Sequence, residues 1–124
     1  MAPSQIQIAI SSLQRLLKEE QSYYTEQAQQ EARIAKLENQ ANDNDENHEY
    51  QLNQERKALE ETKAMIPQMR DRITNAREKL ENMLDTATNE QERDAAVDIL
   101  KKAKDAQKDD PIAGGHGTTA VNGS

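Results

Sequence analysis

The sequence has no cysteine, tryptophan or phenylalanine, and its aromatic residues are three tyrosines, Tyr23, Tyr24 and Tyr50. Without cysteine the chain forms no disulfide and no thiolate metal site, which suits a reducing compartment. Without large aromatic side chains, its core has to be slender and built from aliphatic residues on long helices. The first residues lack the basic and apolar regions of a signal peptide, and no apolar run approaches the roughly 20 residues that span a bilayer. We therefore expect a cytoplasmic protein.

Basic residues are also scarce relative to acidic ones: 16 against 23, a net charge of −7. Four acidic residues and no basic one fall within residues 42–49, whereas the remaining charges are well mixed. Duplex nucleic acid and anionic membranes both attract basic clusters, and this chain has none. The sequence thus predicts neither nucleic acid nor a membrane as a partner.

What the sequence does contain is a heptad pattern. One row of apolar residues at seven-residue spacing comprises Leu52, Leu59, Ile66, Ile73, Leu80 and Ala87. A second row, Thr62, Met69, Ala76 and Met83, completes a seam of the coiled-coil type. The register continues through Pro67, although proline inside a helix costs roughly 3 kcal/mol or more. We predict one long helix over residues 50–86, kinked at Pro67.

A first helix is expected over residues 4–41, starting with a capping box formed by Ser4 and Gln7. Its apolar stripe is strong at the start and polar in the middle. Its apolar residues at the start are Ile6, Ile10, Leu13, Leu17 and Tyr24. Continued at seven-residue spacing, the stripe meets the polar residues Glu20, Gln27 and Glu31, and it becomes apolar again at Ile34 and Leu37.

Residues 42–47 are Asn, Asp and Glu, which favour turns, and a short connection between long helices indicates an antiparallel hairpin. Thr88 or Asn89 is expected to cap a third helix over residues 89–107. The polar segment 109–124 is predicted to be a disordered tail. The predicted fold is all-α: an elongated antiparallel three-helix bundle, or coiled-coil rod, forming one domain over residues 1–108.

Sites for chemistry are not apparent. The two histidines, His48 in the acidic loop and His116 in the tail, lack converging ligands, so a solvated loop is favoured over a metal site. There is no phosphate-binding glycine motif, and the carboxylates lie on helical faces where nothing tunes them for acid–base work. The sequence predicts a protein that binds other proteins, not an enzyme, with no cofactor and no metal.

Several segments are similar to the tubulin-specific chaperone A (tubulin-folding cofactor A) family, and to its fungal members in particular. These are residues 1–8, the Arg-Leu-Leu-Lys-Glu-Glu run at 15–20 with Tyr23 and Tyr24 after it, residues 30–37, and the Lys-Ala-Met-Ile-Pro run at 63–67. The resemblance covers roughly residues 1–105, and the chain departs from it in the acidic loop and after Asp110.

The resemblance implies a chaperone that captures a β-tubulin folding intermediate released by the chaperonin. It then passes that subunit on, with other tubulin-folding cofactors, for assembly of the α/β heterodimer. It also implies action without ATP, in the cytoplasm and in association with the cytoskeleton. The residues that match the family's first helix, with three arginines after Pro67, are the candidate partner surface: Arg15, Lys18, Glu19, Tyr23, Tyr24, Gln27, Gln30, Glu31, Arg70, Arg72 and Arg77.

Each candidate also has a structural interpretation. Tyr24 lies on the apolar stripe, which favours packing. Gln27, Gln30 and Glu31 either cover a thin seam or offer hydrogen bonds to a client. The three arginines either bind acidic tubulin surface or pair with neighbouring carboxylates. The alternative function is a generic three-helix coiled-coil scaffold, and a homodimer that completes the weak centre of the first helix stays open.

Overall fold

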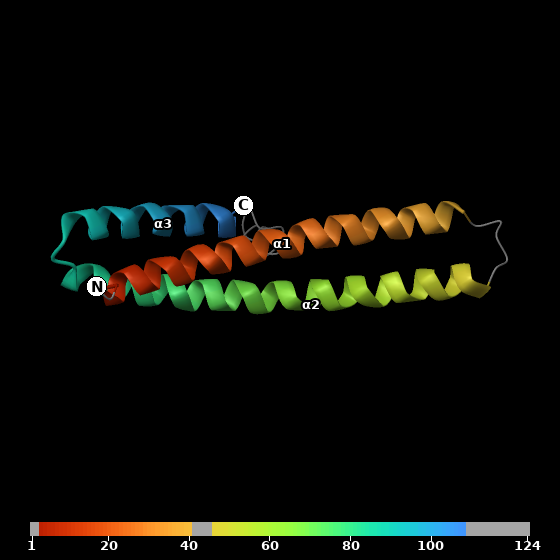
Figure 1. Ribbon diagram of the computed structural model, residues 1–124, viewed down its shortest axis with the longest axis horizontal. Coiled ribbons are helices and arrows are strands. Elements are labelled where there is room, and N and C mark those ends of the chain that lie inside the picture. Colours follow the sequence, from red (N-terminus) through yellow and green to blue (C-terminus); the bar gives the residue numbers. More distant parts are fainter. Residues whose placement is uncertain (1–2, 41–45, 109–124) are drawn as a thin grey trace, which may run out of the picture. The chain divides into compact units, whose positions relative to one another are not determined.

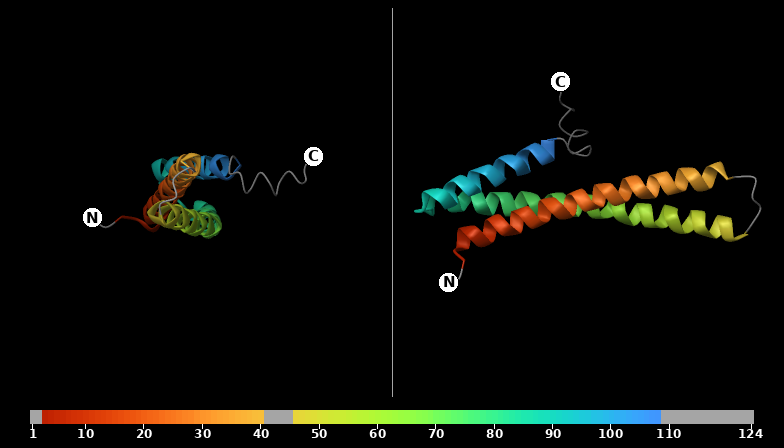
Figure 2. Two further views of the ribbon diagram at one scale, coloured as in Figure 1. Left: turned by 90° about the vertical axis from the view of Figure 1, so that its right-hand side faces the viewer. Right: turned by 45° about the horizontal axis from the view of Figure 1, so that its top comes forward.

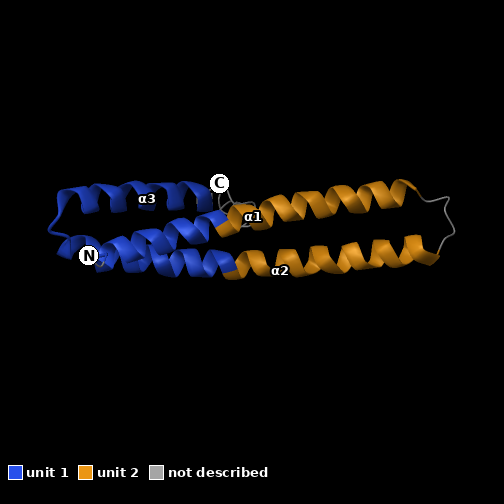
Figure 3. Ribbon diagram, viewed as in Figure 1, with its two compact units in different colours: residues 1–18, 69–124 blue, residues 19–68 orange. Residues whose placement is uncertain are grey.

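The computed structural model describes residues 3–40 and 46–108. They form α1 (Gln5–Asn39), α2 (Glu46–Met83), the 3-10 helix η1 (Leu84–Thr86) and α3 (Glu90–Lys108), as Figure 1 shows. The prediction of an all-α helical bundle is confirmed. The chain divides into two compact units, both of which include parts of α1 and α2: unit 2 comprises residues 19–68, and unit 1 comprises the residues on either side of it (Figure 3).

Unit 1 is a three-helix arrangement in which α3 runs back antiparallel to the end of α2 (Figures 1 and 2). Its core joins side chains from the first turns of α1, the last turns of α2 and one face of α3. This cluster contains Ile6, Ala9, Ile10, Leu13, Ile73, Leu80, Ala96, Ile99, Leu100 and Ala103, all of them buried. Apolar residues at helical spacing on all three segments explain why α3 packs here.

The starts of α1 and α3 are capped as the sequence predicts. The Gln7 amide donates to Ser4 Oγ at 3.1 Å, and the Ser4 amide donates to Gln7 Oε1 at 3.0 Å, which completes the capping box. Of the two predicted caps for α3, Asn89 serves: its Oδ1 accepts the amides of Gln91 and Glu92. Ser4 Oγ also donates to Glu92 Oε2 at 2.9 Å, which joins the starts of α1 and α3.

A polar network ties the far end of α3 to α2. Arg77 Nη1 donates to Gln107 Oε1 at 2.6 Å, and Gln107 Nε2 donates to Thr74 Oγ1 at 2.9 Å. Lys104 Nζ lies 3.6 Å from Glu81 Oε2. Arg77, Gln107 and Thr74 are half-buried, so their hydrogen bonds favour this register of α3 on α2, whereas Lys104 of the ion pair is exposed.

Unit 2 is a pair of antiparallel helical segments, residues 19–40 and 46–68. Polar contacts between them include Arg33 Nε to Glu55 Oε1 at 3.0 Å, Arg56 Nη2 to Glu38 Oε2 at 2.9 Å, and His48 Nε2 to the Leu37 carbonyl oxygen at 2.6 Å. The seam between the segments is markedly polar. Its buried residues are Glu20, Gln30, Thr62 and Ile66.

The start of α2 corrects the predicted loop. The helix begins at Glu46 and not at residue 50, so Glu46, His48 and Glu49 belong to its first turns. Carboxylates at a helix N-terminus interact favourably with the helix dipole, and the contact of His48 with the Leu37 carbonyl oxygen holds this end against α1. The helix α1 ends at Asn39 and not at residue 41. The rest of the predicted acidic loop, residues 41–45, lies outside the described residues.

At its other end, the α-helix α2 stops before the predicted residue 86. The α-helix ends at Met83 and continues as η1, after which Ala87 is extended with φ −71° and ψ 120°. Ala87 therefore leaves the helical seam, although it still packs against the core of unit 1. This change of backbone conformation is needed because the chain has to reverse before α3.

Pro67 lies inside α2, and the helix is continuous through it. Since proline has no amide hydrogen, the Lys63 carbonyl lacks its usual backbone donor there. The kink stays a prediction, as does the one-domain boundary at residue 108. The predicted tail, 109–124, lies outside the described residues.

Replacing Gln30 with leucine is expected to stabilise the fold. Gln30 is 3% exposed, and its Oε1 has no hydrogen-bond partner among the described residues, which costs free energy. We expect Gln30→Leu to raise the free energy of unfolding by about 1 kcal/mol, measured by urea denaturation with far-ultraviolet circular dichroism. Gln29→Leu, one position away and exposed, is the matched control and should change stability little. A loss of stability in Gln30→Leu would contradict this interpretation.

Gln107→Ala removes both hydrogen bonds that Gln107 makes to α2. We expect the free energy of unfolding to fall by about 1 to 2 kcal/mol, because Arg77 and Thr74 each lose a half-buried partner. Amide hydrogen exchange should accelerate in α3 more than in the residues of unit 2. Gln91→Ala, exposed at the start of α3, provides the comparison. Equal exchange rates in the two variants would show that the network does not hold α3.

Candidate partner-binding surface

The candidate residues on α1 differ in accessibility. Arg15, Lys18, Glu19 and Glu31 are exposed; Tyr23, Tyr24 and Gln27 are half-buried; Gln30 is buried. The difference follows from helical periodicity, because Gln30 lies three residues after Gln27 and both face the seam with α2. The two tyrosines are adjacent in the chain, so their side chains point about 100° apart around α1.

Hydrogen bonds within α1 connect these glutamines to neighbouring carboxylates of the same helix. Gln27 Nε2 donates to Glu31 Oε2 at 3.4 Å, and Gln30 Nε2 donates to Glu26 Oε2 at 3.5 Å. Both bonds link residues one turn apart and are long, so they add little stability. Gln27 and Glu31 remain accessible from solvent, whereas burial gives Gln30 a place in the seam.

The three candidate arginines of α2, Arg70, Arg72 and Arg77, belong to unit 1, as do Arg15 and Lys18 on α1. Arg72 is exposed, and its Nη1 lies 4.0 Å from Met69 Sδ. Arg70 is half-buried. Arg77 is also half-buried and donates to Gln107, so α3 and not a neighbouring carboxylate on α2 supplies that partner. Among these arginines Arg72 is the most accessible.

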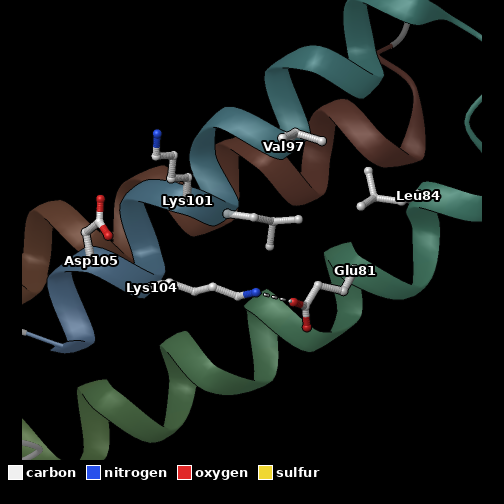
Figure 4. Close-up of a pocket in the computed structure, with 7 residues that line it drawn as sticks. Glu81, Leu84, Val97, Lys101, Lys104 and Asp105 are labelled. Carbon is white, nitrogen blue, oxygen red and sulfur yellow. Dashed lines mark ion pairs between the residues drawn. The ribbon is translucent and has the colours of Figure 1, made fainter.

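A groove in unit 1 was missed by the sequence analysis. It has a volume of about 380 Å³ and lies between the end of α2 and α3 (Figure 4). Leu84, Val97 and Leu100 form its apolar part, and the Lys104–Glu81 ion pair crosses it. Val97 is 51% exposed. The signal was present in the sequence, because Val97 is an apolar residue outside the apolar stripe of α3.

The complete burial of Glu20 was also not predicted. It stands seven residues after Leu13 and seven before Gln27, and it is completely buried. A buried carboxylate is unusual and reduces the apolar content of the seam. The seven-residue spacing was the signal that placed it there.

The two units differ in net charge. Over the sequence, unit 2 carries twelve acidic and five basic residues, whereas unit 1 carries eleven of each. The entire net charge of −7 therefore belongs to residues 19–68. Such an asymmetry steers charged partners toward one part of a protein.

Other classes of site are not found among the described residues. Residues 3–40 and 46–108 hold no group of three or more histidine, cysteine, aspartate or glutamate side chains arranged for a metal ion. None of the helices in those ranges is both long and apolar enough to cross a membrane.

Comparison with known proteins gives the family of the chain. The family model described as "Tubulin binding cofactor A" matches residues 1–106. The chain is 36% identical to the "Tubulin-specific chaperone A" of Saccharomyces cerevisiae over 86 residues, which is 69% of this chain and 77% of the yeast protein. No solved structure matches the chain. The match to the family model extends from α1 almost to the end of α3, and on this evidence the chain belongs to the tubulin binding cofactor A family.

Proposed function

We propose that this tubulin-folding chaperone captures a folding intermediate of β-tubulin and passes it on for assembly of the α/β heterodimer. The observation that carries the proposal is the family match over residues 1–106, together with a yeast relative whose name is tubulin-specific chaperone A. The chaperone acts in the cytoplasm, in association with the cytoskeleton and with other tubulin-folding cofactors. It works by binding alone, without ATP.

The contact residues follow from exposure. Accessible candidates are Tyr23, Gln27, Glu31 and Arg72, with Arg15, Lys18 and Glu19 as exposed charges beside them. Tyrosine is enriched among residues that dominate binding energy because it combines a large apolar area with a hydroxyl group. Gln30 and Arg77 act within the fold, and substitutions there would change stability together with binding.

The test is a pull-down from cytosol with the purified full-length chain, in which α-tubulin and β-tubulin are quantified separately. We expect β-tubulin to be retained in excess over α-tubulin, and to an equal extent after ATP is depleted. The same measurement on a chain that ends at residue 110 shows whether the segment 111–124 contributes. Retention of neither subunit by a helical chain would refute the proposal and favour a general coiled-coil scaffold.

Charge reversal tests the arginine candidates. Arg72→Glu should weaken β-tubulin binding about three- to tenfold, as loss of one or two favourable charge contacts would. Lys79→Glu is the matched control, because Lys79 is exposed and lies seven residues further along the same helix. Circular dichroism should be unchanged in both variants. If the two variants bind alike, Arg72 is not part of the interface.

A further inference from the structure

The two units differ in how many helices cover the seam of α1 and α2. In unit 1, Ile10 on α1 belongs to the same core cluster as Ile99 and Leu100 on α3, and Leu17 packs against that cluster. The seven-residue row that contains Ile10 and Leu17 continues with Tyr24 and Glu31 in unit 2. Unit 2 comprises segments of α1 and α2 alone, so this row has no third helix within its own unit.

The seam residues of α1 and α2 in unit 2 are also incompletely buried. Along α1 and α2, residues at seam positions that would be core in a three-helix bundle are only half-buried. We define the open face of unit 2 by six residues: Tyr24, Gln27, Glu31 and Ile34 on α1, and Leu52 and Leu59 on α2. All are half-buried except Glu31, which is exposed. An amphipathic face of this kind fits a further helix, as helix-in-groove recognition does elsewhere.

Charge identifies the kind of helix. Unit 2 holds the whole net charge of −7, and the open face carries Glu31, with the exposed Glu60 next to Leu59. A helix with lysine and arginine on its polar face would be attracted to this surface. A second copy of unit 2 carries the same net negative charge and therefore lacks this attraction.

The apolar side of a helix that binds unit 2 is expected to resemble that of α3. That helix presents Ala96, Ile99, Leu100 and Ala103 to α1 and α2, all of them buried. Small residues permit a close approach, and the two large aliphatic residues fill the seam. Its 19 residues match the 21 residues of α1 within unit 2, since each residue advances a helix by about 1.5 Å.

We propose that the open face of unit 2 binds a cationic amphipathic helix of the client, which takes the place that α3 occupies in unit 1. The inference rests on the proposed function, which it deepens by placing one client contact on unit 2, in addition to the candidate Arg72 of unit 1, and by giving the chemical class of the segment recognised there. Tyr24, Ile34, Leu52 and Leu59 supply the apolar contact. Gln27 supplies hydrogen bonds, and Glu31 and Glu60 attract the basic side chains.

The first arm of the test uses a peptide probe and the full-length chain. The probe is a labelled peptide of residues 90–108 with Asp94→Lys, Asp98→Lys and Asp105→Lys, which are exposed positions in α3. These changes raise the peptide's charge from zero to +6 and leave its apolar side intact. The unchanged peptide is the control. Fluorescence anisotropy should show saturable binding of the cationic peptide, weakened by salt, and at least about tenfold weaker binding of the neutral one.

Two double variants then locate the site. Glu31→Lys with Glu60→Lys changes unit 2, and Asp71→Lys with Glu78→Lys makes the same change of charge at exposed positions of α2 in unit 1. The unit 2 variant should bind the cationic peptide about tenfold more weakly, and the unit 1 variant within about twofold of the unchanged chain. Exchange of the peptide with α3 is disfavoured, because a tethered helix has a high effective concentration. Equal binding of both peptides, or equal loss in both variants, would overturn the inference.

The second arm repeats the tubulin pull-down with the same two variants. Selective loss of β-tubulin from the unit 2 variant supports the inference. If both variants retain β-tubulin as the unchanged chain does, the proposed function stands and the open face is not its site. If the unchanged chain retains no tubulin but binds the cationic peptide at unit 2, the proposed function fails while the helix-binding face stands.

Discussion

The pairing of α1 with α2 in a heptad register is the constraint on which the other features depend. In unit 1 the register presents an aliphatic surface, and α3 covers it through Ile99, Leu100 and two alanines. In unit 2 the polar residues Glu20 and Thr62 are buried at heptad positions, and Gln30 is buried one position before the heptad residue Glu31. Because a coiled-coil seam repeats every seven residues, each substitution of a polar for an apolar residue weakens one layer without disturbing the next. The heptad pairing of α1 with α2 thus continues through unit 2, although the seam there contains fewer apolar side chains.

This distribution explains why the polar contacts of the two units have different roles. In unit 1 the Arg77–Gln107–Thr74 network adds specificity to a core that is already apolar. In unit 2, Arg33–Glu55 and Arg56–Glu38 join helices whose seam is partly polar. Exposed ion pairs contribute little stability, typically below about 1 kcal/mol each. Among the described residues the seam of unit 2 holds fewer buried apolar side chains than the core of unit 1, and a partner that covers this seam would add apolar contact.

A chaperone that works by binding needs such a surface more than it needs a chemical site. The described residues show grooves and half-buried seams, with charge concentrated in one unit, and the family match supports a role in tubulin folding. Weakly stabilised segments are where proteins most readily exchange internal contacts for contacts with a partner. In unit 2 Tyr24, Gln27 and Ile34 are half-buried.

The sequence by itself determined the helices, the heptad seam, the Ser4–Gln7 capping box and the family, since periodicity and capping are local properties of the chain. It misplaced the start of α2, because the contact between His48 and the Leu37 carbonyl oxygen joins two helices and has no local signal. Tertiary structure alone decided that Gln30 is buried while Glu31 is exposed, that Arg77 bonds to Gln107, and that Val97 lines a groove. Each of these outcomes depends on which neighbouring helix packs on a given helical face. Heptad spacing identifies the apolar face of a helix but not the helix that packs on it.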